Sequence, residues 1–282
     1  MRTPFPRTEV EGISLPRMLI GSNWMMGYSH TSQAADDSIC RLNRNPEAVA
    51  DIVAAFAESG VDALMGGISR EETLRLGLEL AEQRLGKKII RIDTPVLNVD
   101  DTPEARREAL AAIRLSRACG AVICMPHHTS VEQLVCKNTQ TIDRLPDYLA
   151  MIRDEGMVPG LSAHMPECIV YSDQNEYDVQ TYIQIYNCAG FMMQVEIEYI
   201  HKVIHAAKKP VMAIKPMAAG RVSPFVGLTF AYATLRECDM VTVGCMTPGE
   251  AREDVEFGLA AIERRAPGTP GRGSFHKTEV MK

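Results

Sequence analysis

The 282-residue sequence has no apolar run of the roughly 20 residues that would cross a bilayer. Its first ten residues are polar and rich in proline, and they contain no hydrophobic segment like that of a secretory leader. Acidic residues outnumber basic ones, 36 against 30, and the net charge of −6 disfavours nucleic-acid binding, which usually needs a basic surface. These absences predict a soluble, cytoplasmic protein whose partner is a small molecule, and they leave assembly into a homo-oligomer open.

Paired cysteine motifs are also lacking. The eight cysteines are scattered, and no two are spaced as C-x-x-C, which excludes zinc-ribbon and thioredoxin-like sites. A disulfide framework is unusual in a chain this long, so the cysteines are expected to be buried, reduced thiols. Hydrophobic residues make up 46% of the chain and charged residues 23%, which is the composition of an ordinary globular protein.

Eight short apolar runs alternate with helix-like segments along the chain. Such a repeat is typical of the α/β class and predicts a single closed (β/α)8 barrel of the TIM type, for which about 250 residues is usual. The expected strands are residues 17–25, 61–67, 88–97, 121–125, 158–164, 191–196, 210–215 and 239–245.

The expected helices begin and end in a regular way. Asn45 and Thr102 each place a capping side chain directly before a proline at the first helical position. Five helices, among them one expected around residues 176–188, end at a glycine close before a strand, which favours equal βα units over two domains. The chain is therefore divided into an N-terminal extension (1–16), the barrel (17–265) and a C-terminal tail without periodicity (266–282).

Several of the apolar runs end in a polar side chain that could take part in chemistry. In a (β/α)8 barrel the carboxyl ends of the strands meet on one face, where active sites are built. If the strands present these side chains to that mouth, imidazoles and carboxylates would surround one cavity, and an amine would arrive from the seventh strand. The residues are Asp93, His127 or His128, His164, Glu196 and Lys215.

Each of these residues also has a purely structural interpretation. The histidines could be hydrogen-bonded into the fold, Asp93 could brace a neighbouring arginine, and Glu196 could begin a solvent-exposed helix. Lys215 lies in an apolar segment, where desolvation would lower its pKa and allow it to act as a base or a Schiff-base nucleophile. Its alternative is an ion pair with a carboxylate such as Glu196. Trp24, at the end of the first strand, is a further candidate for the mouth, with core packing as its alternative.

The second half of the chain resembles the aldo-keto reductases. "PGLSAHMPE" (159–167) is similar to that family's Gly-x-Ser-Asn segment on strand five, and "FMMQVEIEY" (191–199) to its Asn-Gln-Val-Glu-Tyr segment on strand six. "PVMAIKPMAAGRVSP" (210–224) resembles its strand-seven turn, and "VTVGCMTPGEAREDVE" (241–256) its eighth strand and the helix start that follows. The opening "TEVEGISLPRMLIGSN" (8–23) resembles its N-terminal hairpin and first strand, so the resemblance covers most of the chain through motifs of moderate specificity.

This resemblance implies a nicotinamide cofactor. Ser162 and Gln194 stand where the family's serine and glutamine hold the carboxamide. Arg252, together with backbone N–H groups at the start of the last helix, would bind the phosphate of NADP.

The family's chemistry also uses a tetrad of Asp, Tyr, Lys and His. Only the histidine has candidates in this chain, His127 and His128. "LMGGIS" (64–69) replaces the expected aspartate, and no tyrosine follows it. "RIDTP" (91–95) places Asp93 where the lysine is expected.

Because the Tyr–Lys pair is missing, the sequence favours metal-assisted acid–base chemistry of the lyase or isomerase type on a small carbonyl or sugar-like substrate. One alternative is an NADP-dependent oxidoreductase with an altered tetrad, and another is a non-catalytic binding barrel. The predicted ligands of a zinc, manganese or iron ion are His127, His164 and Glu196. The predicted catalytic residues are Lys215, Glu196, Asp93 and His128.

Overall fold

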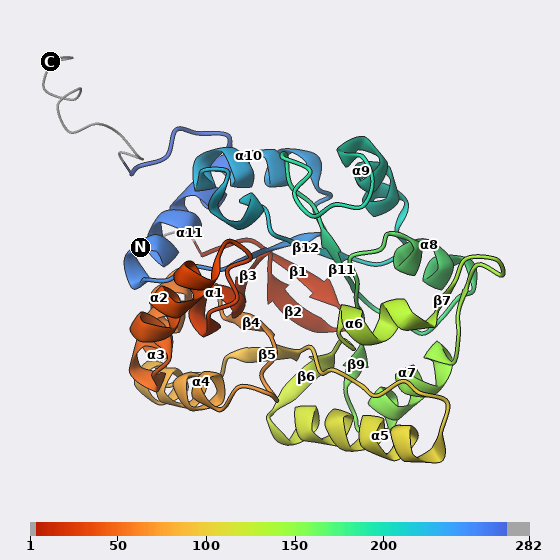
Figure 1. Ribbon diagram of the computed structural model, residues 1–282. Coiled ribbons are helices and arrows are strands. Elements are labelled where there is room, and N and C mark those ends of the chain that lie inside the picture. The colour runs from red at the N-terminus through yellow and green to blue at the C-terminus, as the bar shows by residue number, and fades with distance from the viewer. Residues whose placement is uncertain (1–3, 270–282) are drawn as a thin grey trace, which may run out of the picture.

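A ring of parallel strands lies at the centre of the molecule, and the helices surround it (Figure 1). The structure is a computed structural model that describes residues 4–269. Most of the expected C-terminal tail lies outside the described residues. Within them, no helix is both long and apolar enough to cross a membrane.

The central sheet closes on itself. Its nine strands follow the order β10-β11-β12-β13-β3-β4-β5-β6-β9. β9 and β10 are two halves of one strand separated by Gly160, so the ring holds eight strands, and it closes because β9 pairs with β6 and β10 with β11. The expected (β/α)8 barrel is thereby confirmed. The strands are β3 (Met18–Gly21), β4 (Ala63–Gly66), β5 (Ile90–Asp93), β6 (Ala121–Cys124), β9 (Val158–Pro159), β10 (Leu161–Ser162), β11 (Tyr182–Ile185), β12 (Val211–Ile214) and β13 (Met240–Val243).

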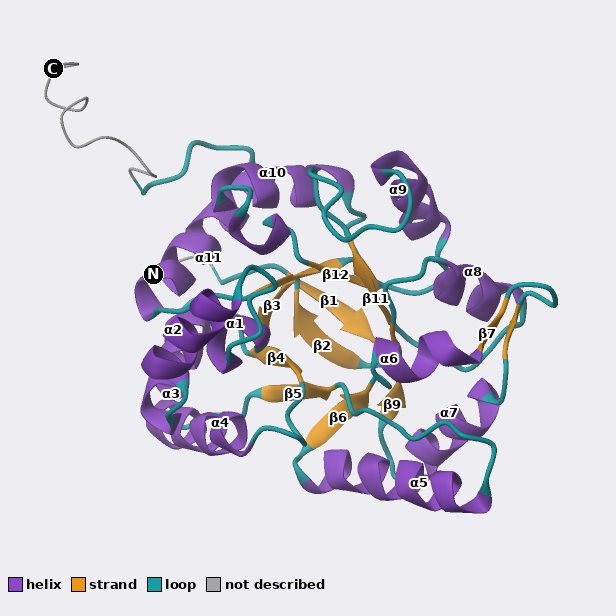
Figure 2. Cartoon of the chain, in the orientation of Figure 1, coloured by secondary structure: helices purple, strands orange, loops and turns teal. Residues whose placement is uncertain are grey.

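Apolar side chains fill the ring. Leu19, Ile92 and Ile123 are buried in one inner cluster, and Val10 and Leu15 of an N-terminal hairpin belong to the same cluster. This hairpin, β1 (Arg7–Val10) and β2 (Ile13–Pro16), lies across the ring in Figure 2. It covers the amino-terminal end of the barrel and leaves the carboxyl ends of the strands as the open mouth.

The outer helices form where the sequence supplies caps and stops. Side chains of Asn45, Thr102 and Thr247 accept hydrogen bonds from the first turns of α3 (Pro46–Ala57), α5 (Pro103–Ala118) and α11 (Pro248–Glu263). The other helices of the described residues are α1 (Asn23–Met26), α2 (Gln33–Asn43), α4 (Glu72–Leu85), α6 (His128–Val131), α7 (Leu145–Asp154), α8 (Glu167–Gln174), α9 (Ile197–Ala206) and α10 (Pro224–Thr234). Two 3-10 turns, Glu132–Leu134 and Ala218–Gly220, and a small hairpin of β7 (Val135–Cys136) and β8 (Thr141–Ile142) complete them.

The sixth strand lies earlier in the chain than the sequence pattern predicts. It is β11, so the expected helix around 176–188 and the expected strand at 191–196 are both wrong. β11 contains Tyr182 and two isoleucines, which favour strands, and all its residues are buried between the inner cluster and the outer helices. Residues 191–196 form the turns that lead into α9, and their apolar, Met-rich composition imitates a buried strand.

Candidate active site

A cavity of about 400 Å³ opens at the carboxyl ends of the strands. Its floor comes from strand residues that point inward, among them Met65, Ser162, Ile183 and Thr242. The segments that follow the strands form its walls and contribute Asn23, Trp24, His30, His127, His128, His164 and Lys215. The cavity therefore occupies the position at which (β/α)8 barrels carry their active sites.

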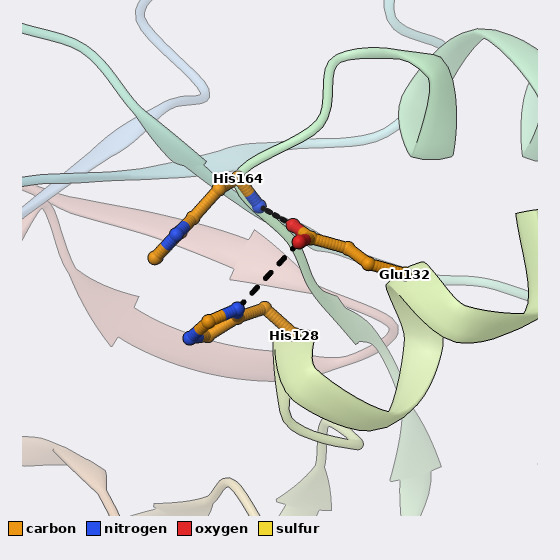
Figure 3. Close-up of side chains that lie close together, drawn as sticks. All are labelled: His128, Glu132 and His164. Carbon is orange, nitrogen blue, oxygen red and sulfur yellow. Dashed lines mark hydrogen bonds and ion pairs between the residues drawn. The ribbon is translucent and has the colours of Figure 1, made fainter. Parts of the chain in front are cut away.

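Three histidines meet on one wall of this cavity. His127 and His128 begin α6 directly after β6, and His164 follows β10. The His128 and His164 rings stack, with centroids 3.9 Å apart and planes 20° from parallel (Figure 3). The His127 ring lies 4.2 Å from that of His128, and its Nδ1 is 2.9 Å from Thr129 Oγ1. The histidines expected at two separate strand ends thus form one cluster.

Glu132 holds this cluster in place from behind. Its carboxylate accepts hydrogen bonds from the backbone N–H groups of His164, at 2.6 Å, and Met165, at 3.1 Å. Its other oxygen lies 3.7 Å from Nδ1 of His128 (Figure 3). Burial raises the pKa of Glu132, but the interaction with His128 and the hydrogen bonds from both amides outweigh it and leave that pKa below its usual value. Glu132 therefore stays ionised and fixes the end of β10 against α6.

Glu132 was not among the expected site residues, although the sequence contains a signal for it. Glu132 follows His128 by four residues, the spacing at which two side chains meet on one helical face. Glu132 thus takes the place beside the histidines that the sequence analysis assigned to Glu196.

The histidine cluster has suitable donors for a metal ion but a different arrangement. His128, Glu132 and His164 offer ligand atoms that lie within 4.8 Å of one another. An imidazole binds a metal through a lone pair in the plane of its ring, and two stacked rings direct these lone pairs along nearly parallel planes. One oxygen of Glu132 is also occupied by two amides. As arranged, the cluster does not fit a coordination shell.

Lys215 faces the histidines from the end of β12. Its backbone adopts the left-handed conformation, with φ of 58°. Burial lowers the pKa of its ammonium group to about 8. Within the described residues no carboxylate forms an ion pair with Lys215, so the alternative of a pair with Glu196 is wrong. An unpaired amine in a partly desolvated pocket is unusual outside functional sites.

Two of the histidines near Lys215, His127 and His164, are held in their neutral form. Burial, followed by the charges of His128 and Lys215, lowers the pKa of His164 to about 3. Burial, followed by His128 and Arg70, lowers the pKa of His127 to about 4. Near neutral pH the cavity therefore combines the titratable amine of Lys215 with the uncharged imidazoles of His127 and His164, which can donate or accept a hydrogen bond.

Acidification is expected to destabilise the protein through these histidines. Their pKa values in the fold lie below the ordinary 6.5, so the unfolded chain binds more protons as the pH falls from 6.5 towards 4. Each histidine should remove up to about 1.4 kcal/mol of unfolding free energy per pH unit in that window. Urea unfolding at pH 7, 6 and 5 measures this slope.

His164→Gln should flatten the slope, because it removes one of the two shifted groups. Ile183→Val, in the same cavity, is the matched control that should lower stability equally at each pH. An unchanged slope in His164→Gln would contradict the assigned pKa shift of His164.

Asp93 does not reach the cavity. Ile92 points into the ring, so Asp93 points outward, where it accepts hydrogen bonds from Ser69 N at 3.0 Å and Ser116 Oγ at 2.5 Å. It is fully buried and joins β5 to the outer layer. The expected convergence of Asp93 with the histidines is wrong because the neighbouring residue takes the inward position.

The residues expected to bind the cofactor also lie in different parts of the structure. Ser162 lines the cavity floor. Gln194 and Glu196 lie outside the sheet, since they follow the true sixth strand, and Glu196 only precedes the first turn of α9. Arg252 points away from the cavity and forms two hydrogen bonds with Glu58, at 3.0 and 2.8 Å.

Trp24 and His30 line the cavity and complete its wall. Nδ2 of Asn23 lies 3.4 Å from Nε2 of His30. A Cβ at Gly244 would lie 3.2 Å from Trp24 Cδ1, so the backbone after β13 closely approaches the indole ring.

Solved structures resemble this chain along most of its length. No family model and no curated protein matches it. A protein from Pseudomonas aeruginosa assigned to the aldo-keto reductases superposes with a TM-score of 0.65 at 12% identity, covering 93% of this chain and 97% of its own. An aldo/keto reductase from Brucella melitensis gives 0.56 at 12%, covering 92% and 99%. An aldo-keto reductase from Klebsiella pneumoniae, solved with NADPH, gives 0.53 at 13%, covering 95% and 92%.

These comparisons establish that the chain has a divergent aldo-keto reductase-like barrel, as the sequence motifs predicted. At such low identity the likeness shows the fold alone.

Proposed function

We propose that this divergent barrel is an oxidoreductase that acts on the carbonyl or hydroxyl group of a small polar substrate. In this proposal Lys215 transfers the proton and a nicotinamide dinucleotide is the cofactor. The observation that carries the proposal is Lys215 itself, an unpaired and largely buried amine at the catalytic end of the barrel.

Lys215 has the properties of a proton donor for a carbonyl oxygen. A general acid works best when its pKa lies near the working pH, and burial brings the pKa of Lys215 to about 8. Its ammonium form would protonate the oxygen during reduction, and its amine form would take the proton from a hydroxyl during oxidation. Lys215 thus supplies the function that a tyrosine–lysine pair would otherwise serve, from a different strand.

The histidine cluster would hold the same substrate oxygen. His127 and His164 are neutral, so their ring N–H groups can donate hydrogen bonds without competing with Lys215 as acids. Glu132 fixes both ends of the cluster through His128 and the His164 amide. A rigid pair of donors opposite the acid is the arrangement that stabilises charge developing on an oxygen.

The extent of the cavity supports a nicotinamide dinucleotide as its ligand. From Ser162 and Lys215 the cavity continues past Gly220 and Gly244 to the start of α11. Ser162 would hold the carboxamide, and the dinucleotide would run along the glycine backbone that packs against Trp24. When bound, the reduced nicotinamide supplies a hydride to the carbonyl carbon, and the protein supplies the proton that completes the alcohol.

A second candidate is cofactor-free acid–base chemistry of the lyase or isomerase type. The loss of the tetrad's aspartate, tyrosine and lysine favours it. In this case the Lys215 amine would remove a proton from the carbon next to a carbonyl, and the histidines would hold the resulting oxyanion. The stacked rings do not support a metal-assisted form of this reaction.

Trp24 allows a direct test, because it is the single tryptophan of the chain and lines the cavity. Titration with NADH and with NADPH, each to millimolar concentration, should quench its fluorescence saturably for at least one of them. The same dinucleotide should raise the melting temperature, since a ligand that binds only the folded state stabilises it.

Trp24→Phe should lose the fluorescence response, which shows that the signal comes from Trp24. The melting shift of the wild-type protein measures dinucleotide binding independently of fluorescence. A flat titration with both dinucleotides, without a melting shift, would contradict the oxidoreductase and leave the acid–base candidate.

A further inference from the structure

We propose that the cavity selects a dinucleotide without a 2′-phosphate, so that the chain binds NAD(H) in preference to NADP(H). This inference rests on the proposed function and assigns its cofactor class. It departs from the NADP that the family resemblance implies.

Carboxylates line the part of the cavity that α11 forms. Glu250, Glu253 and Asp254 line it together, because positions i, i+3 and i+4 share one face of α11. A phosphate at this end would bring close to two negative charges against them. The hydroxyl groups of an unmodified ribose would instead donate hydrogen bonds to carboxylates, which is how dinucleotide-binding folds commonly recognise NAD.

The arginine of α11 and the N–H groups of Met246 and Glu250 at the start of that helix already have partners. Arg252 lies on the opposite side of α11 and is held by both oxygens of Glu58. Thr247 Oγ1 accepts the N–H of Glu250, and the Glu250 carboxylate accepts the N–H of Met246 at 2.8 Å. The carboxylate of Glu250 therefore already occupies the start of α11, where the helix dipole would otherwise favour a phosphate.

The floor of the same cavity contains a polar group without a hydrogen-bond partner among the described residues. Thr242 lines the cavity and is 6% exposed, and its hydroxyl has no hydrogen bond among the described residues. A buried hydroxyl without a partner is uncommon in native folds and marks a place where a ligand with donors or acceptors belongs. It lies on β13, the strand that leads directly into the acidic start of α11.

Dissociation constants for NADH and NADPH, measured by Trp24 quenching and by calorimetry, test this inference without relying on turnover. NADH should bind at least tenfold more tightly than NADPH at low salt. Added salt should bring the two dissociation constants closer together, because it screens the charges of the carboxylates.

Glu253→Lys should shift the NADH-to-NADPH preference at least tenfold towards NADPH. Glu72→Lys, the same charge change at an exposed position on α4, is the control that should leave the preference unchanged.

The outcomes separate the two proposals. Equal binding of both dinucleotides, or tighter binding of NADPH, overturns the cofactor preference and leaves the oxidoreductase standing. Binding of neither dinucleotide overturns the proposed function together with this inference. A Glu253→Lys variant that keeps its preference for NADH contradicts the electrostatic cause.

Discussion

Replacing Lys215 by methionine is expected to lower turnover by about 10²- to 10⁴-fold while making the protein more stable. The activity falls because the variant lacks the amine whose pKa of about 8 suits it to exchange a proton with the substrate oxygen near neutral pH. The stability rises because methionine fills a similar volume and removes an unpaired cation, whose pKa of about 8 instead of 10.5 corresponds to a cost of up to about 3 kcal/mol. Initial rates and urea unfolding, measured on the same preparation, check both effects.

The lowered pKa of Lys215 also predicts how the stability of the protein changes with pH. Between pH 8 and 10.5 the unfolded chain keeps a proton on Lys215 that the folded chain has lost. The wild-type protein should therefore gain stability as the pH rises through that window, and Lys215→Met should lack this gain.

Lys215→Arg is the matched control, because arginine keeps the charge but does not lose its proton in this pH range. Lys215→Arg should lose turnover as Lys215→Met does. It should not be more stable than the wild-type protein, because the buried charge remains. A Lys215→Met variant that retains more than a tenth of wild-type turnover would contradict the assignment of Lys215 as the proton donor.

Asp239→Ala should cause a large loss of stability, of about 3–5 kcal/mol. Asp239 is fully buried before β13, where its carboxylate accepts hydrogen bonds from Arg236 and from the N–H of Val211. Arg236 in turn donates to the carbonyls of Ala207 and Lys209, so one carboxylate ties the starts of β12 and β13 together. Removing it leaves a partly buried guanidinium uncompensated. For a chain of this size the melting temperature should fall by about 10 °C.

Asp51→Ala provides the comparison for this effect. Asp51 pairs with Arg84 at 2.7 Å, but 60% of its side chain is exposed, so the loss should stay below about 1 kcal/mol. If Asp239→Ala cannot be purified, Asp239→Asn, which keeps one acceptor, should fold with an intermediate melting temperature. Equal melting temperatures for the Asp239 and Asp51 variants would contradict the role given to the buried network.

The architecture was accessible from the sequence because burial imposes a regular pattern. Seven of the eight expected runs contain a strand of the ring, since a short apolar segment between two capped helices is usually a buried strand. The sixth failed because β11 contains Gln184 at a fully buried position, while the exposed Met192 lies in an apolar segment outside the sheet. Local composition does not reveal which of two adjacent segments the rest of the fold buries.

The site was only partly accessible for a related reason. Position after a strand correctly indicated that His127, His128, His164 and Lys215 face one cavity. It could not decide which way Asp93 points, because a strand end presents alternate residues to opposite faces. The placement of Glu132 depends on the path of the chain after α6, which brings that carboxylate to the amides of the next strand end.

The most direct measurement is the titration of Lys215 in the folded protein, followed by ¹³C NMR of labelled lysine and assigned with Lys215→Arg. The structure predicts a midpoint near pH 8, displaced when NADH fills the cavity. A midpoint near 10.5 that no dinucleotide moves would show that the amine is an ordinary solvated lysine and would contradict its place in a catalytic cavity.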